Sequence, residues 1–303
     1  MIPTARQLLF DTNPRLGQES ATRDLMEKEF FSSIRLSNRV FKTTSVRRLD
    51  DVNQTLIAVF QKLGVAPTTF LDIAISSGTS TIEWVESLQQ AGLRPHMTAT
   101  DLTTIAYLVR LFRGCHVLVD KEGFPLQYDV FGIALRPWCP VRYYIFGNYF
   151  LTVMYRFVYW RLAQRLHLLK RLEALRGKAP PGDDPVVKAQ VKLVSYRLRN
   201  KKEIELLDDD ITEPTPSHLK RRFQVVRAAN ILNRNYFSTR QLVEGAKNLR
   251  DRMSGPGAFL LIVRTEDRGG NHGTVFRLND YGSLEVVARI GRGSEIEDIV
   301  LCT

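Results

Sequence analysis

Three acidic residues stand at or near the ends of short apolar segments, where carboxylates can meet a ligand. Asp72 lies within the apolar run 70–75, Asp101 ends the segment MTATD, and Asp210 ends the segment IELLDDD. A carboxylate at the end of a strand can accept hydrogen bonds from both hydroxyls of a ribose, and another can accept from an adenine amino group. These positions predict a site for a nucleotide-like ligand, with Asp101 on the ribose and Asp210 on the base.

A cluster of small residues follows the first of these segments. Ala74, Ser76, Ser77 and Gly78 separate the apolar run from a helical pattern at 79–90. Small side chains let a ligand approach the backbone, and the first-turn amides of a helix are unpaired and attract anions. The same composition also suits packing at a tight turn, so both interpretations stay open.

Alternating strands and helices would position these residues. Continuous apolar runs are typical of strands buried on both faces, and helical periodicity follows them here. The order favours an α/β fold with a doubly wound, mostly parallel sheet, in which ligands lie beyond the carboxyl ends of the strands. Strands are expected at 70–75, 95–102, 202–214, 221–232 and 258–265, helices at 79–90, 103–112 and 238–257, and a C-terminal antiparallel hairpin at 274–290.

Further segments lie outside this alternation. Residues 20–64 carry helical periodicity, with Ser45 as a cap and Gly64 as a stop. Residues 115–132 alternate in polarity around a Lys-Glu-Gly turn, which predicts a β-hairpin. The expected parts are an N-terminal helical lead-in at 1–65, a sheet domain at 66–114 and 200–303, and an insertion of hairpin and helices at 115–199.

The ordered set of segments resembles the class I S-adenosylmethionine-dependent methyltransferases. FLDIAISSG, TATDL, LLDDDI and VVRAANIL follow one another as the first four strand ends of that family do, and a hairpin closes the chain. The likeness covers 66–114 and 200–303 and implies a Rossmann-like sheet with S-adenosyl-L-methionine as cofactor. The cofactor-binding residues that it implies are Asp72, Ala74, Ser76, Ser77, Gly78, Asp101, Leu102, Asp210, Ile211, Ala228 and Asn230.

The chain departs from the family at the first motif, which usually has the form D-x-G-x-G-x-G. Ala74 and Ser76 occupy the first two glycine positions and only Gly78 remains. Alanine and serine tolerate a positive φ less well than glycine does. A shorter stretch, 226–262, is similar to the chemotaxis-receptor glutamate methyltransferases. The Asn/Asp-Pro-Pro-Tyr/Phe signature of methylation on bases or glutamine is absent.

Ordinary roles compete with ligand contact at several positions. Asp72 can cap backbone amides at the turn, and Asp101 can cap a following helix. The acids at 208–210 can form a solvated turn, and Asn230 can either line the transfer site or bridge backbone groups. None of the five histidines lies in a motif that marks a general base, so no catalytic residue and no metal ligand is assigned.

Composition limits the partners and the compartment. With 43 Lys+Arg against 32 Asp+Glu, the net charge of +11 suits nucleic acid, an anionic membrane surface or an acidic ligand. No RNA-binding module is visible, which makes nucleic acid the weaker expectation. Cys115, Cys139 and Cys302 form no zinc or disulfide pattern, and the first residues do not read as a signal peptide. A cytoplasmic protein is expected.

An aromatic segment inside the insertion raises a separate question. Residues 143–160 are half aromatic and precede a basic stretch, but Arg156 and a helix break expected near Gly147 argue against a membrane span. The segment 141–178 can be a lid over the active site or a contact between subunits. It can also dip into a membrane interface with its basic turns on anionic headgroups, which would place the protein peripherally at the inner membrane surface.

These observations predict a methyltransferase acting on a small-molecule or lipid-like acceptor. An RNA methyltransferase or nucleic-acid-binding protein is the alternative prompted by charge. A non-catalytic methyltransferase-like domain is the alternative prompted by the missing glycines. A nicotinamide-linked oxidoreductase fits less well, because the G-x-G-x-x-G fingerprint is missing.

Overall fold

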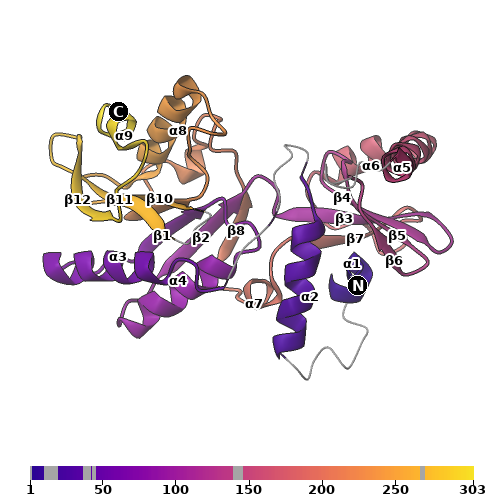
Figure 1. Ribbon diagram of the computed structural model, residues 1–303, viewed down its shortest axis with the longest axis horizontal. Helices are drawn as coiled ribbons and strands as arrows, with labels where there is room; N and C mark the ends of the chain where they lie inside the picture. The colour runs from indigo at the N-terminus through magenta and orange to yellow at the C-terminus, as the bar shows by residue number, and fades with distance from the viewer. Residues whose placement is uncertain (1, 10–19, 37–41, 43–45, 139–145, 267–269) are drawn as a thin grey trace. The chain divides into compact units, whose positions relative to one another are not determined.

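The computed structural model describes residues 2–9, 20–36, 42, 46–138, 146–266 and 270–303 (Figure 1). The chain forms two compact units. The antiparallel unit contains Met1–Thr43 and Thr103–Leu193, and the parallel unit contains Thr44–Leu102 and Val194–Thr303. The first segment of the parallel unit thus begins before the expected position 66, and it ends at 102 instead of 114. The N-terminal segment joins the unit built from the insertion.

A seven-stranded sheet forms the centre of the parallel unit, with the order β12-β11-β10-β9-β1-β2-β8. Strands β8, β2, β1, β9 and β10 run parallel, β11 is antiparallel to β10, and β12 is antiparallel to β11. The expected doubly wound, mostly parallel sheet with a C-terminal hairpin is confirmed. The strands are β1 (Thr69–Ile73), β2 (His96–Asp101), β8 (Glu205–Asp208), β9 (Val225–Ala229), β10 (Phe259–Thr265), β11 (Asn271–Leu278) and β12 (Leu284–Ile290).

Helices cover both faces of this sheet (Figure 1). One face packs against α3 (Asp50–Leu63) and α4 (Thr79–Gln90), and the other packs against α8 (Thr239–Arg252) and α9 (Glu297–Leu301). The short helices α7 (Tyr196–Arg199) and η3 (Ser217–Leu219) complete the unit.

The helix ends follow the sequence signals in part. Gly64 ends α3 in the left-handed region with φ 63°, as expected. The helix begins at Asp50, and the expected cap Ser45 lies outside the described residues. Ser238 and Gln241 form a capping box at the start of α8, which fixes that helix after β9.

The antiparallel unit is built on a five-stranded sheet with the order β6-β5-β4-β3-β7. Its strands are β3 (Ile105–Phe112), β4 (Cys115–Val119), β5 (Pro125–Val130), β6 (Ile133–Leu135) and β7 (Val187–Lys192). Helices α1 (Ala5–Leu9) and α2 (Ser20–Ser33) pack on one face, while α5 (Phe146–Arg165) and α6 (Leu168–Leu175) pack on the other. The predicted hairpin is therefore present as β4 and β5, within a larger sheet than expected.

Two predictions for this unit are wrong. The segment 103–112 is predicted to be a helix, but Ile105–Phe112 forms β3. Its buried side chains alternate between the two faces of the sheet: Ala106 packs toward α1 and α2, and Tyr107 packs toward α5 and α6. A strand covered on both sides reads as a continuous apolar run. The break in the helical stretch lies at His167, with φ 49°, and α5 runs through Gly147.

A buried carboxyl group gives the antiparallel unit a pH-dependent stability. Asp120 is 1% exposed in the β4–β5 turn, where its Oδ1 accepts hydrogen bonds from the amides of Glu122 (3.0 Å) and Phe124 (2.7 Å). Among the described residues, its Oδ2 has no hydrogen-bond partner. Burial raises the pKa of Asp120 to about 6. Folding of the unit is therefore favoured by protonated Asp120, and this contribution is lost as the pH rises from about 4 to about 6.

Replacing Asp120 by asparagine is expected to remove this dependence. The amide oxygen can keep both backbone hydrogen bonds, and the neutral side chain carries no desolvated charge. At neutral pH the variant should gain up to about 3 kcal/mol in unfolding free energy over the parent chain, and little at pH near 4. Denaturant unfolding at the two pH values measures the difference. An equal gain in unfolding free energy at both pH values would contradict this expectation.

Candidate functional site

The loop between β1 and α4 adopts a conformation normally reserved for glycine. Ala74, Ser76 and Gly78 all have positive φ, at 58°, 58° and 77°. A left-handed residue other than glycine or asparagine costs about 1–2 kcal/mol. The three positions are those of the expected glycine motif, so the loop keeps the backbone shape of that motif with two of its glycines replaced. Strain of this kind persists where surrounding contacts impose it and is frequent at functional sites.

Hydrogen bonds from neighbouring elements hold the loop. The Ile75 amide donates to the Thr100 carbonyl on β2 (3.1 Å), and the Ser76 amide donates to Asp101 Oδ2 (2.6 Å). The Ser77 carbonyl accepts from the amide of Ser195, which precedes α7 (2.7 Å). The loop is thus tied to the end of β2 on one side and to α7 on the other.

Gly78 leaves no room for a side chain in the present arrangement of α7. A Cβ at this residue would lie 2.1 Å from Cδ2 of Leu198, which is fully buried in α7. Gly78 directly precedes Thr79, the first residue of α4. The first-turn amides of α4 therefore follow the loop directly, and the partial positive charge at a helix N-terminus suits an anionic group.

Asp101 ends β2 next to the loop, as the sequence predicts. Its side chain is held by the Ser76 amide, and its carbonyl accepts from the Asp209 amide (2.9 Å). The residue is 8% exposed. The alternative role as a helix cap does not apply, because the segment that follows it forms β3.

Asp72 has a different environment from the one expected. Its two oxygens accept from Arg227 Nε (2.9 Å) and Nη2 (2.6 Å), and Oδ2 also accepts from Thr81 Oγ1 (2.7 Å). The side chains of Asp72 and Arg227 are 3% and 0% exposed. Asp72 therefore anchors the base of the loop from inside the unit, and both of its carboxylate oxygens accept hydrogen bonds from side chains of the protein.

Arg227 is the residue that the sequence analysis missed. Its Nη1 donates to Asn53 Oδ1 on α3 (3.0 Å), its Nη2 donates to the Ser80 carbonyl on α4 (3.1 Å), and its guanidinium lies 4.0 Å from the centroid of the Trp84 ring. A lone cation inside the apolar strand VVRAA, with an acid in another apolar strand, was the available signal. Buried charges are paired in proteins, so Asp72 and Arg227 could have been matched.

The acids after β8 divide into separate roles. Asp208 is level with Asp101 in the β2–β8 register. Asp209 forms a buried ion pair with Arg252 of α8 (2.9 Å). Asp210, half-buried, accepts on Oδ1 from the Thr212 amide (2.9 Å) and from Thr212 Oγ1 (2.7 Å), so its carboxylate is fixed at the rim of the sheet.

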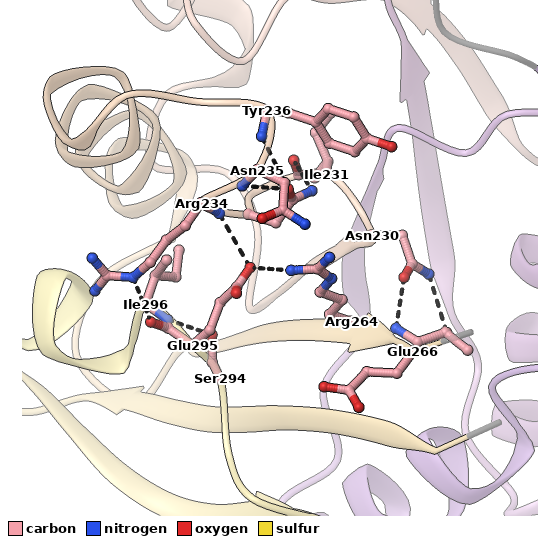
Figure 2. A network of polar contacts seen from close by, with 12 residues as sticks. Asn230, Ile231, Arg234, Asn235, Tyr236, Arg264, Glu266, Ser294, Glu295 and Ile296 are labelled. Atoms are coloured by element: carbon pink, nitrogen blue, oxygen red, sulfur yellow. Dashed lines mark hydrogen bonds and ion pairs between the residues drawn. The ribbon is translucent and has the colours of Figure 1, made fainter. Parts of the chain in front are cut away.

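The remaining predicted positions lie around the same rim. Leu102 is half-buried, while Ile211 and Ala228 point their side chains into the core on the α8 side. Asn230 follows β9 with φ 60°, its Oδ1 accepts from the Thr265 amide (2.7 Å), and its Nδ2 donates to Thr265 Oγ1 (3.3 Å). With these contacts Asn230 bridges backbone groups, and it joins the ends of β9 and β10 (Figure 2).

A polar network fixes the segment after Asn230 (Figure 2). Glu295 Oε1 accepts from the Arg234 amide (3.2 Å) and from Arg264 Nη1 (2.8 Å). Arg234 Nη2 also contacts both oxygens of Asp298 at 2.9 Å. Tyr236, 75% exposed, is presented by this anchored segment. The segment is therefore held by several polar contacts beside the carboxyl ends of β9 and β10.

A cavity of about 210 Å³ lies at the opposite rim, beside the amino ends of β1 and β2. Its lining includes His96, Glu205 and Arg222, and Glu205 is already held by Arg222 (2.7 Å) and Thr98 Oγ1 (2.8 Å). The predicted site residues lie at the carboxyl ends instead. The cavity and the predicted site therefore lie at opposite rims of the sheet.

The chain resembles several solved structures of other proteins. No family model and no curated relative matches the chain. The solved structures that resemble it include the N-methyltransferase NodS from Bradyrhizobium japonicum WM9 with S-adenosyl-L-homocysteine, at 11% identity and TM-score 0.32, covering 74% of this chain and 65% of that chain. The plantazolicin methyltransferase BpumL with S-adenosylhomocysteine gives 11% identity and TM-score 0.35, covering 86% and 57%.

A third structure, the CMeT domain of the citrinin polyketide synthase, gives 13% identity and TM-score 0.33, covering 71% of this chain and 35% of that chain. The chain thus spans between about a third and two thirds of these three proteins. Likeness at this level assigns no acceptor and no site residue.

Proposed function

We propose that the chain is an S-adenosyl-L-methionine-dependent methyltransferase acting on a small-molecule or lipid-like acceptor. The observation that carries the proposal is the β1–α4 loop, in which residues 74, 76 and 78 all take positive φ although two of them are not glycine. Packing alone needs no such repeated conformation at the carboxyl edge of a parallel sheet, where ligands of this sheet type bind.

The surrounding residues fit an adenosyl ligand. Asp101, at the end of β2, would accept from the ribose hydroxyls, and Asp210, at the rim after β8, would accept from the adenine amino group. The first-turn amides of α4 would face the carboxylate of the amino-acid part. The cofactor supplies an activated methyl group on a sulfonium centre. The residues of the chain would mainly hold the acceptor in line with that group.

Ligand-dependent stabilisation tests the proposal against the oxidoreductase alternative. S-adenosylhomocysteine is expected to raise the unfolding temperature of the full chain, because a ligand at one hundred times its Kd adds about 2.7 kcal/mol to stability. Oxidised nicotinamide adenine dinucleotide should give no rise. A rise with the dinucleotide alone, or no rise with either ligand, would contradict the proposal.

A further inference from the structure

Helix α5 carries an apolar face that its own unit leaves uncovered. Its large apolar side chains between 149 and 158 are exposed by 40 to 66%. They are Tyr149, Phe150, Leu151, Val153, Met154, Phe157 and Val158. Contiguous apolar surface of this kind on a soluble protein marks a contact site.

The opposite side of the same helix is firmly attached. Tyr159 and Ala163 are buried against the five-stranded sheet, with Tyr128 and Val119 among their neighbours in that core. The Tyr159 hydroxyl also donates to the Gly123 carbonyl in the β4–β5 turn. The helix therefore needs no further partner to stay in place, and its exposed apolar face is not required for packing within the unit.

Positive charge accompanies this face. Between residues 146 and 178 the sequence has seven lysines and arginines and one acid, Glu173. Arg161 and Arg165 are exposed on the last turns of α5, and the guanidinium of Arg161 lies 6.0 Å from the centroid of the Phe157 ring. Lys170 and Arg176 continue the exposed basic surface onto α6 and its end. The charge favours an anionic partner and disfavours a second copy of the same basic face.

We propose that the exposed face of α5 docks on an anionic lipid bilayer. Aromatic and aliphatic side chains would enter the interface, and the basic residues of α5 and α6 would meet the headgroups. A helix of 20 residues lies along such a surface for about 30 Å. Within the described part of the chain, no helix has the length and apolarity needed to cross a membrane. The contact is therefore peripheral, and it stands independently of the methyl-transfer proposal.

Vesicle flotation of the full chain tests the docking surface. The parent chain is expected to float with phosphatidylcholine vesicles that contain phosphatidylserine, and to be released by high salt. The double variant F150S/F157S and the double variant R161E/R165E should each weaken this binding by at least about tenfold. Two matched variants in the parallel unit should leave it unchanged: Y281S, at a tyrosine that is 94% exposed, and R94E/K220E, at two exposed cations.

Three outcomes would overturn the proposal. The first is that the parent chain does not float with anionic vesicles at low salt. The second is that F150S/F157S floats as well as the parent chain, which would leave only non-specific attraction by the +11 charge. The third is a parent chain that sediments as a dimer and a F150S/F157S variant that is monomeric with unchanged vesicle binding, which would assign the face to a second copy. Sedimentation of both proteins gives that comparison.

Discussion

Replacing Arg227 by methionine is expected to lower the unfolding free energy of the parallel unit by about 3–5 kcal/mol. Methionine fills similar space but leaves the Asp72 carboxylate buried, with Thr81 Oγ1 as its remaining side-chain donor among the residues that the structure describes. A buried charge without its counter-ion is far more costly than the pair is favourable. The Asn53 oxygen and the Ser80 carbonyl also lose a donor. The loss should therefore spread from β1 to α3 and α4.

Comparing R227M with a double variant separates the cost of an unpaired buried charge from a simple loss of contacts. Adding D72N to R227M removes the uncompensated charge and should recover part of the lost stability. The matched control is R234M, which breaks the exposed Arg234–Asp298 pair and should cost no more than about 1 kcal/mol. Denaturant unfolding gives the energies, and hydrogen exchange over β1, α3 and α4 shows whether the loss spreads as expected. A double variant no more stable than R227M would contradict the mechanism.

Replacing Asp101 by alanine is expected to weaken binding of S-adenosylhomocysteine about 100-fold or more. In the proposed binding mode, two hydrogen bonds from ribose hydroxyls to the Asp101 carboxylate would be lost, each contributing about 1.5–3 kcal/mol. The Ser76 amide also loses its acceptor at 2.6 Å, so the left-handed loop is less well held. Calorimetric titration of the full-length variant measures the affinity.

Replacing Asp101 by asparagine separates the contribution of the ribose hydrogen bonds from that of the Ser76 amide contact. D101N keeps an oxygen for the Ser76 amide but removes the charge, so we expect a smaller loss, about tenfold. D280N, at an exposed acid in the turn between β11 and β12, is the control and should bind like the parent chain. Unchanged affinity in D101A, with the protein folded, would contradict the assignment of Asp101 to the ligand.

The sequence predicts the site better where local rules decide and less well where distant pairing decides. Asp101 and the small residues at 74–78 are recognisable because they follow apolar runs, and parallel strands bring their carboxyl ends to one edge. The Asp72–Arg227 pair joins residues 155 positions apart. Each was visible as a charge inside an apolar strand, but only the sheet order places β1 beside β9.

The conformation of the loop is a second case. Local preference opposes positive φ at Ala74 and Ser76. The structure imposes it through contacts with Thr100 and Asp101, which belong to the next strand. Tertiary hydrogen bonds thus outweigh a local cost of about 1–2 kcal/mol per residue. A missing glycine in a sequence motif therefore does not by itself mean a missing backbone shape.

The antiparallel unit is a further case in which pairing between distant segments decides the structure. The β4–β5 hairpin is local and was predicted from its turn. Strand β3 pairs with β7, with Ala106 opposite Val191, across a stretch that includes α5 and α6. No local signal identifies that partner, so 103–112 was assigned to a helix and the five-stranded sheet was not foreseen. The N-terminal helices were likewise not assigned to this unit.

A crystal structure of the full chain with S-adenosylhomocysteine tests the central claim most directly. We expect the ribose hydroxyls to lie within hydrogen-bonding distance of Asp101, and the amino-acid part of the ligand to lie against the backbone of 74–78. A ligand seated at the amino rim instead, between His96 and Arg222, would contradict it. So would a ligand at the carboxyl rim that leaves the left-handed loop untouched.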